Sequence, residues 1–273
     1  MPLPPTDRSR ANVLGVGINA LSMQTAVSAI DAALSSGQKG YVCVTGVHGV
    51  METQRDEGLK AILNNSFLTT PDGMPTVWVG RWQGFGGMER VYGPDLMLEI
   101  CRLSLARGYT HFLYGGKPGV AQRLQSELQR GFSGIRILGA HCPPFRKLND
   151  AEESELIQRV ADLKPDLFWV GLSTPKQERF MADFIHKLDT RLMLGVGAAF
   201  DIHAGLLKDS PAWVKKAGLQ WLHRLIQEPA RLWKRYLVNN PEFLVKICLQ
   251  LTGLKRYKIQ PGTPGSGLVS RAA

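Results

Sequence analysis

The chain has 273 residues, of which 44% are hydrophobic and 21% charged, a composition typical of a folded protein with a sizeable core. It contains no run of about 18 apolar residues of the kind that predicts a transmembrane helix. Its N-terminus lacks the apolar core of a secretory signal. The four cysteines are scattered, without a C-x-x-C pair, and the six histidines do not cluster with them at the spacing of metal ligands. This pattern argues against structural zinc and favours a reduced, cytoplasmic protein.

The net charge of +10 is concentrated near the C-terminus. Residues 206–258 contain eleven Lys or Arg and three Asp or Glu, a net charge of +8 in about a fifth of the chain. Such asymmetry indicates an anionic partner, for which phospholipid, polyphosphate and nucleic acid are the candidates.

Short apolar runs alternate with helix-like stretches along the first 205 residues. The predicted strands cover residues 13–18, 41–45, 67–69, 110–114, 135–138, 167–171 and 191–196. The predicted helices cover residues 23–36, 50–63, 94–106, 120–129, 151–163 and 176–187. Because the strands are almost continuously apolar, this alternation predicts an α/β fold, a Rossmann-like and mostly parallel sheet with helices on both faces.

The pattern changes after Gly205. Pro211, Pro229 and Pro241 each stand where a short helix could begin, since proline is tolerated in a first helical turn. We therefore expect a catalytic domain over residues 1–205, a basic helical appendage over 206–258 and a flexible Gly/Pro/Ser-rich tail over 259–273.

Unusual loops follow several predicted strands, at the edge where open parallel sheets bind their ligands. They cover residues 45–48, 70–73, 115–119, 171–178 and 195–201. Asp72 stands in a Pro-Asp-Gly sequence that also suits an ordinary tight turn. At the end of a strand, however, a carboxylate could deprotonate an attacking hydroxyl as a general base.

Two of these loops have features suited to phosphate. Pro175 can start a helix whose free N–H groups suit a diphosphate, although a polar helix start facing water is the alternative. The glycines of 115–119 do not form a Walker A motif and could simply make a tight β–α turn. No Asp-x-Asp triplet is present to hold a metal-bound diphosphate, so a sugar-nucleotide donor would need cations and N–H groups to meet its leaving-group charge. Arg90 and Lys176 are the candidates, and an ordinary solvated surface charge is the alternative for each.

Seven segments, in this order and spacing, resemble the WecG/TagA/CpsF family, glycosyltransferase family 26. They are PDG at 71–73, ERVYG at 89–93, GGKPG at 115–119, PKQE at 175–178, GVGAAFDIHAG at 195–205, WLHRL at 221–225 and EPARLWKRY at 228–236. Each segment is weakly specific alone, but the series covers roughly residues 13–236 and makes chance similarity improbable.

The resemblance implies an inverting, metal-independent transferase without a cofactor, active in cell-surface polysaccharide synthesis. Its implied partners are a UDP-sugar donor, an undecaprenyl-diphosphate-linked sugar acceptor and an anionic membrane surface, and no nucleic acid. Known members transfer N-acetylmannosamine, its uronic acid or glucose at the inner face of the membrane. We therefore expect a cytoplasmic enzyme that is peripheral on the plasma membrane.

By position, Asp72 corresponds to the family's proposed base and Arg90 to the arginine proposed to stabilise the diphosphate. Thr45 and Gln177 correspond to pocket residues. In the family, a C-terminal appendage closes over the active site and contacts the membrane. Its cationic positions are occupied here by Arg224, Arg231 and Lys234. The loops add further substrate-binding candidates: His48, Gly115, Gly116, Gly171, Lys176, Glu178 and Asp201.

The chain departs from the family pattern at three places. Val47 occupies the asparagine position of a common T-x-N motif, so the identity of the transferred sugar stays open. Whether His48 replaces the missing asparagine also stays open. Asp209-Ser-Pro211 replaces a common R-A-P, which removes one cation. Residues 142–145 replace a common G-Y-F, so the residues that contact the nucleotide are not assigned by the resemblance.

Two other functional classes compete with this interpretation. A sugar-nucleotide oxidoreductase would need G-x-G-x-x-G after the first strand, but Gly15-Val-Gly17 has no third glycine. A non-enzymatic basic module that binds membrane or nucleic acid would explain the appendage and leave the strand-end loops without a role. The oligomeric state is not predicted.

Overall fold

The structure, a computed structural model, describes residues 9–260, with the side chain of Lys216 excepted. It opens with an antiparallel hairpin of β1 (Arg10–Val13) and β2 (Val16–Asn19). The prediction of one strand over 13–18 was wrong, because Leu14 and Gly15 have φ angles of 53° and 85° and turn the chain. Glycine adopts this left-handed conformation without a steric cost, which allows the apolar run to fold back on itself.

The main sheet has six strands in the order β4-β3-β8-β7-β5-β6, and every neighbouring pair is parallel. The strands are β3 (Gly40–Thr45), β4 (Leu68–Pro71), β5 (Thr110–Gly115), β6 (Arg136–His141), β7 (Leu167–Gly171) and β8 (Leu192–Gly195). The predicted α/β fold with a parallel sheet is confirmed.

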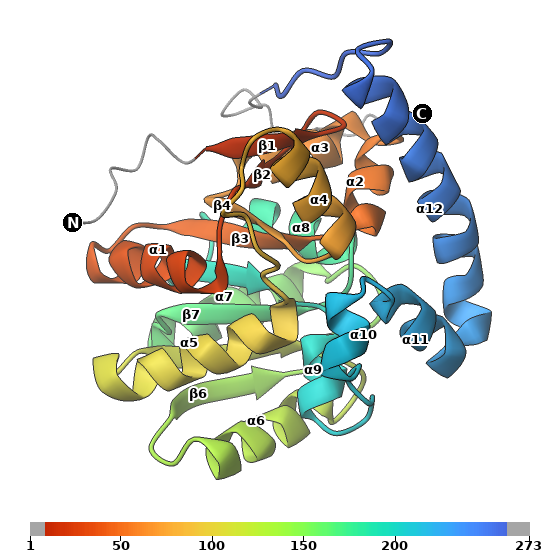
Figure 1. The fold of residues 1–273 in the computed structure, drawn as a ribbon. Coiled ribbons are helices and arrows are strands. Elements are labelled where there is room, and N and C mark those ends of the chain that lie inside the picture. Colours follow the sequence, from red (N-terminus) through yellow and green to blue (C-terminus); the bar gives the residue numbers. More distant parts are fainter. Residues whose placement is uncertain (1–8, 261–273) are drawn as a thin grey trace.

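Helices cover both faces of this sheet (Figure 1). They are α1 (Met23–Ser35), α2 (Val47–Thr53), α3 (Glu57–Asn65), α4 (Met74–Trp82), α5 (Gly93–Arg107), α6 (Val120–Gly131), α7 (Asp150–Leu163), α8 (Lys176–Phe184) and α9 (Ala199–His203). One core cluster joins the sheet to α1, α5, α6 and α9, and a second joins its other face to α2, α3, α7 and α8.

Two predictions about these helices need correction. The single helix predicted over 50–63 is divided into α2 and α3, because the Asp56 carboxylate accepts a hydrogen bond from the Leu59 N–H and starts a new helix there. Helix α4, which follows Asp72, and the short α9 were not predicted.

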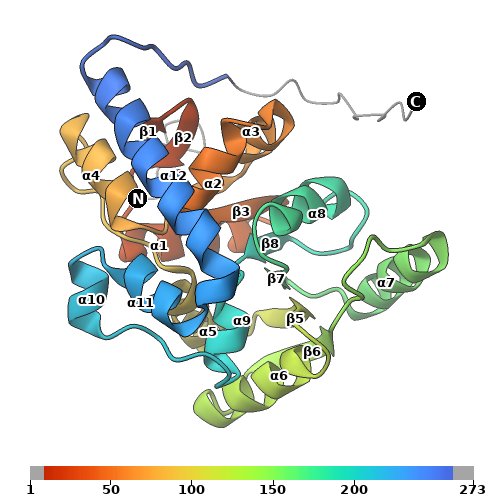
Figure 2. The ribbon, with the colours of Figure 1, turned by 90° about the vertical axis from the view of Figure 1, so that its right-hand side faces the viewer.

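Three further helices, α10 (Ala212–Lys216), α11 (Gln220–Gln227) and α12 (Pro229–Leu251), form the C-terminal part (Figure 2). Pro241 lies inside α12, so the prediction that it begins a separate helix was wrong. Helix α12 packs against α2, and its Phe243 and Ile247 belong to the second core cluster. Within residues 9–260, no helix combines the length and the apolar character needed to span a membrane.

The segment after α12 returns to the N-terminal hairpin. The Tyr257 carbonyl accepts a hydrogen bond from Asn12, and the Gln260 carbonyl accepts one from Asn64. The predicted flexible tail thus begins with Ile259 against the hairpin and Gln260 against α3, and its residues 261–273 lie outside the described residues.

Candidate active site

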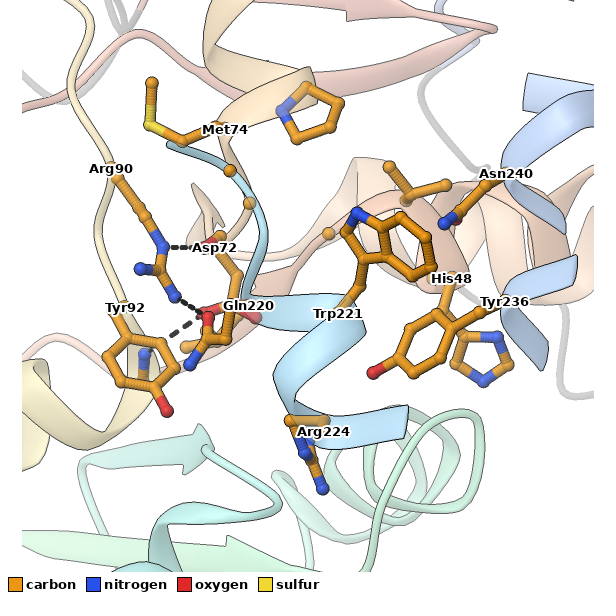
Figure 3. A pocket seen from close by; sticks show the side chains of 18 of the residues that line it. His48, Asp72, Met74, Arg90, Tyr92, Gln220, Trp221, Arg224, Tyr236 and Asn240 are labelled. Carbon is orange, nitrogen blue, oxygen red and sulfur yellow. Dashed lines mark hydrogen bonds between the residues drawn. The ribbon is translucent and has the colours of Figure 1, made fainter. Parts of the chain in front are cut away.

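A cavity of about 490 Å³ lies where the carboxyl ends of β3, β4, β7 and β8 face α11 and α12. Its wall includes Gly46 after β3, Asp72 after β4, Thr174 after β7 and Gly197 after β8. The appendage adds Arg224 and further residues of α11 and α12 (Figure 3). This volume and position suit a small-molecule site at the edge of a parallel sheet.

The carboxylate of Asp72 is positioned by the register of β3 and β4. The Asp72 N–H donates to the Thr45 carbonyl at 3.0 Å, which fixes the backbone directly after β4. The Gly93 N–H, at the start of α5, donates to Asp72 Oδ1 at 3.3 Å. Gly46 borders the other oxygen, since a Cβ atom there would lie in ordinary van der Waals contact with Asp72 Oδ2, at 3.8 Å.

Arg90 lies beside Asp72. Its Nε donates a hydrogen bond to the main-chain carbonyl of Asp72 and not to the carboxylate. Its Nη2 donates to Gln220 of α11, and its guanidinium lies 4.1 Å from the centre of the Tyr92 ring (Figure 3). The Tyr92 hydroxyl donates to Asp209 at 2.9 Å, and burial raises the pKa of this tyrosine. Arg90 is therefore held at a junction between the sheet and the appendage.

Three arginines of the appendage form a cationic wall opposite the sheet. Arg224 and Arg231 share one carboxylate, that of Glu228, which lies 3.2 Å from Arg224. Arg235 also lines the cavity, its Nε is buried without a hydrogen-bond acceptor, and burial lowers its pKa. Three cations with one shared anion leave an excess of positive charge that suits a diphosphate.

Helices α4, α5 and α8 begin at the cavity, and in none does the N-cap residue bind the first turn through its side chain, although Asp72 accepts a hydrogen bond from the first N–H of α5. By contrast, α1, α3 and α7 each begin with a Ser, Asp or Asn cap. Helix N-termini carry free N–H groups and a partial positive charge, so an anion in the cavity would be stabilised by three of them.

His48 of α2 lines the cavity with its ring Nδ1 3.2 Å from the Asn239 side-chain nitrogen. Burial, reinforced by the positive charge of Arg235, lowers its pKa to about 3. The imidazole is therefore neutral at physiological pH and can exchange hydrogen bonds with a sugar without adding charge.

Gln177 and Asp201 also line the cavity, whereas Glu178 is buried behind it. The Glu178 carboxylate accepts hydrogen bonds from Thr174 at 2.8 Å and Gln177 at 3.1 Å, and burial raises its pKa. It thereby orients the Gln177 amide, whose buried oxygen has no partner of its own. Burial also raises the pKa of Asp201, against the opposing effect of Arg231.

Three predicted glycines do not line the cavity, although they lie near its floor. A Cβ atom at Gly115 would lie 2.6 Å from the Gly171 Cα atom, and the Gly116 N–H donates to the Gly171 carbonyl at 3.0 Å. These glycines let β5 and β7 approach backbone to backbone, which is the tight-turn alternative noted for this loop.

Three other predicted residues also lie outside the cavity lining. Thr45 is buried and acts through the carbonyl that binds Asp72. Lys176 is exposed, with its Nζ 3.9 Å from the centre of the Phe145 ring. Lys234 is exposed and lies near a tryptophan ring of α12.

The sequence interpretation missed several residues of the cavity wall. They include Gln220 and Trp221 of α11 and Arg235, Tyr236 and Asn240 of α12. For Arg235 the available signal was helical spacing, because it follows Arg231 by four residues and therefore lies on the same side of a helix. Within the described part of the chain, no group of three or more His, Cys, Asp or Glu side chains could hold a metal ion.

Comparison with known proteins agrees with this geometry. A profile described as the glycosyl transferase WecG/TagA/CpsF family matches residues 11–257. The chain is 26% identical over 207 residues to the N-acetylglucosaminyldiphosphoundecaprenol N-acetyl-beta-D-mannosaminyltransferase of Bacillus subtilis (strain 168), covering 76% of this chain and 78% of that one. The protein of the same name from Bacillus spizizenii (strain ATCC 23059 / NRRL B-14472 / W23) is 27% identical over 222 residues, with 81% and 84% covered. Since the profile spans both the sheet and the helices that close the cavity, the chain belongs to the WecG/TagA/CpsF family of glycosyltransferases.

Proposed function

We propose that this glycosyltransferase moves N-acetylmannosamine, or a closely related hexose such as its uronic acid or glucose, from a UDP-sugar to a sugar carried on undecaprenyl diphosphate. The names of the two relatives support the acceptor and the type of sugar. The observation that carries the proposal is the pairing, in one cavity, of the Asp72 carboxylate with a wall of arginines. A base next to a diphosphate-binding surface is what this reaction requires.

In the proposed reaction, Asp72 takes the proton of the acceptor hydroxyl as the hydroxyl oxygen attacks the anomeric carbon of the donor. A new C–O bond forms, the bond between that carbon and the donor diphosphate breaks, and UDP leaves with the electron pair. Attack from the face opposite the departing UDP inverts the anomeric centre. The site therefore needs one base and a surface that stabilises the leaving diphosphate.

The leaving diphosphate is proposed to bind cations and N–H groups without a metal ion. Arg90, Arg224, Arg231 and Arg235 all line the cavity, together with the first turns of α4, α5 and α8. Preorganised donors aimed at developing charge supply several kcal/mol of transition-state stabilisation (about 3–4 for one oxyanion donor).

We further propose that the enzyme acts at the inner face of the plasma membrane, bound peripherally through α10–α12. The net charge of +8 over residues 206–258 suits anionic lipid headgroups. Large apolar side chains on α11 and α12 are exposed beside these cations, among them Ile226, Trp233 and Leu237. Apolar and basic groups on one surface are the signature of interfacial binding.

The proposal is tested by measuring the transfer of sugar from donor to acceptor. The full chain is incubated with N-acetylglucosaminyl diphosphate lipid and, in parallel, with UDP-N-acetylmannosamine, its uronic acid and UDP-glucose. We expect one donor to give a disaccharide lipid of inverted anomeric configuration, in EDTA as well as in Mg²⁺. Absence of product from all three donors would contradict the proposed substrates, whereas activity lost in EDTA and restored by Mg²⁺ or Mn²⁺ would contradict the metal-free mechanism alone.

A further inference from the structure

The cavity has an apolar part that the proposed chemistry at Asp72 does not use. It lies between α4 and α12, and we call it the α4–α12 groove. Its main side chains are Met74, Trp78 and Trp82 of α4 and Phe243, Leu244 and Ile247 of α12.

The spacing of these residues gives the groove two continuous apolar walls. On α4, Met74, Trp78 and Trp82 are four residues apart and therefore lie along one helix face. On α12, Phe243 and Ile247 have the same spacing. Both walls point into the same cavity, so the groove runs along the two helices.

The groove is covered at its inner end by the connection between α10 and α11. A Cβ atom at Gly218, where φ is +72°, would lie 3.0 Å from the Trp78 ring and 3.3 Å from the Met74 Cβ atom. Only a glycine fits this backbone conformation and this approach. The inner end is therefore enclosed, next to Asp72 and Arg90 (Figure 3).

The outer end of the groove is open to the surface. Trp82, at the C-terminal end of α4, is 68% exposed, and Leu244 of α12 is 62% exposed. The groove thus leads from the charged centre of the cavity to large apolar side chains at the protein surface. A ligand that fits it has a charged head and an apolar chain that continues beyond the protein.

We propose that the α4–α12 groove binds the first isoprene units of the acceptor's polyprenyl chain, which places the sugar at the other end of the diphosphate beside Asp72. This inference rests on the proposed function. Burial of an apolar chain against these walls is favourable in proportion to the area removed from water. The groove acts as a specificity element for the lipid carrier.

The uracil ring of the donor is a poorer occupant of the same groove. Its edge carries hydrogen-bonding groups that need partners when they are buried, and unpaired groups would weaken binding. Of the six groove side chains, only the two indoles offer a polar hydrogen-bonding group. The nucleotide is therefore expected elsewhere in the cavity.

The test compares two acceptors, N-acetylglucosaminyl diphosphate esterified to farnesol and the same head group esterified to ethanol. The measured quantity is the ratio of kcat/KM for farnesyl over ethyl acceptor. We expect this ratio to fall on the order of tenfold in Trp82→Ala and in Leu244→Gln, since each loses an apolar contact to the chain.

The chain offers a matched control for each variant. Trp213 is 68% exposed like Trp82, and Val245 is 61% exposed like Leu244, but neither lines the cavity. Trp213→Ala and Val245→Gln should keep the ratio of the unaltered chain.

An equal fall in the controls, or an unchanged ratio in both groove variants, would overturn the proposal. A weakened UDP affinity in the groove variants would assign the groove to the nucleotide and overturn it as well. Failure of the proposed function looks different, because the unaltered chain would then transfer sugar to neither acceptor.

Discussion

Single side chains decide the proposed chemistry, and Asp72 is the first of them. Asp72→Asn removes the base but keeps the size of the side chain and its place beside the Gly93 N–H. Turnover should fall by about 10²–10⁴-fold, while the dissociation constant for UDP stays nearly unchanged. Steady-state kinetics and calorimetric titration with UDP measure the two quantities. Near-normal turnover would eliminate Asp72 as the base and make Asp201, the other carboxylate of the cavity wall, the next residue to replace.

His48 links the cavity to the pH dependence of stability. Its folded pKa of about 3 lies below the value of 6.5 for a free imidazole, so between these pH values the unfolded chain binds a proton that the folded chain does not. Its contribution to stability is therefore complete above pH 6.5 and is lost as the pH falls toward 3. From pH 7.5 to 5.0 the loss is about 2 kcal/mol.

We expect His48→Gln to reduce this loss, measured as the difference in unfolding free energy between urea titrations at the two pH values. Because burial also lowers the pKa of His111, to about 4, part of the pH dependence stays in the variant. The control is His186→Gln, at a histidine exposed to solvent, which should keep the full difference. An unchanged difference in His48→Gln would mean that this imidazole does not titrate as described.

At the scale of elements, α12 is part of the folded core rather than an attached arm. Phe243 is 3% exposed and packs in the cluster that contains Val50 and Met51 of α2, and Arg55 binds Asn239 and Glu242 across the same contact. The helix that carries Arg231 and Arg235 into the cavity is thus anchored on the sheet side.

Phe243→Ala should therefore lower the unfolding free energy by about 3–5 kcal/mol, the usual cost of a large cavity in a core. Val245→Ala, on the exposed face of the same helix, should change it by no more than about 0.5 kcal/mol. Urea titration followed by circular dichroism measures both. If the two variants were equally stable, α12 would be only loosely attached to the sheet.

The sequence predicted most elements whose signals are local, although it missed the Asp56 cap that starts α3 and the turn at Gly15. The buried strands and the helices capped by serine or asparagine have such signals, and the loops at their ends meet because parallel strands end at one edge. Helix α4 gave no such signal, because Gly80 and its β-branched and aromatic neighbours disfavour a helix. The structure explains the glycine: a Cβ atom at Gly80 would lie 2.1 Å from the Met88 sulfur, so packing overrides propensity there.

The site was predicted in part for the same reason. Asp72 and Gln177 lie in loops that follow strands, whereas Arg90 was placed by the family resemblance, and all three line the cavity. Helical spacing places both Lys234 and Arg235 near the face of Arg231, because they follow it by three and four residues. Spacing alone does not choose between them, because the rotation of α12 depends on which of its faces packs on α2. That choice is made by Phe243 and Ile247, whose partners are about 190 residues away in sequence.

At the scale of the whole molecule, charge and exposed apolar surface lie together on α10–α12. We expect the full chain to bind vesicles containing anionic phosphatidylglycerol at low salt and to bind them less well as salt is raised, because ions screen the attraction. The double variant Trp233→Ser with Leu237→Ser should bind on the order of tenfold more weakly. Phe145→Ser, at an exposed apolar residue after β6, is the control and should bind normally. Co-sedimentation measures all four conditions, and an unaltered chain that ignores anionic vesicles at low salt would refute peripheral attachment through α10–α12.

The contact between the β1–β2 hairpin and residues 250–257 also bears on the order in which the molecule folds during synthesis. Asn12 and Leu14 find their partners in Tyr257 and Gln250, which are 245 and 236 residues later in the chain. At ribosomal speeds of about 5–20 residues per second, the earliest hairpin waits about 12–50 s for these partners to be synthesised. The strands and helices between them can fold in order as they emerge, but these contacts of the hairpin form only after residues 250–257 have been synthesised. A hairpin that is made early is therefore completed late.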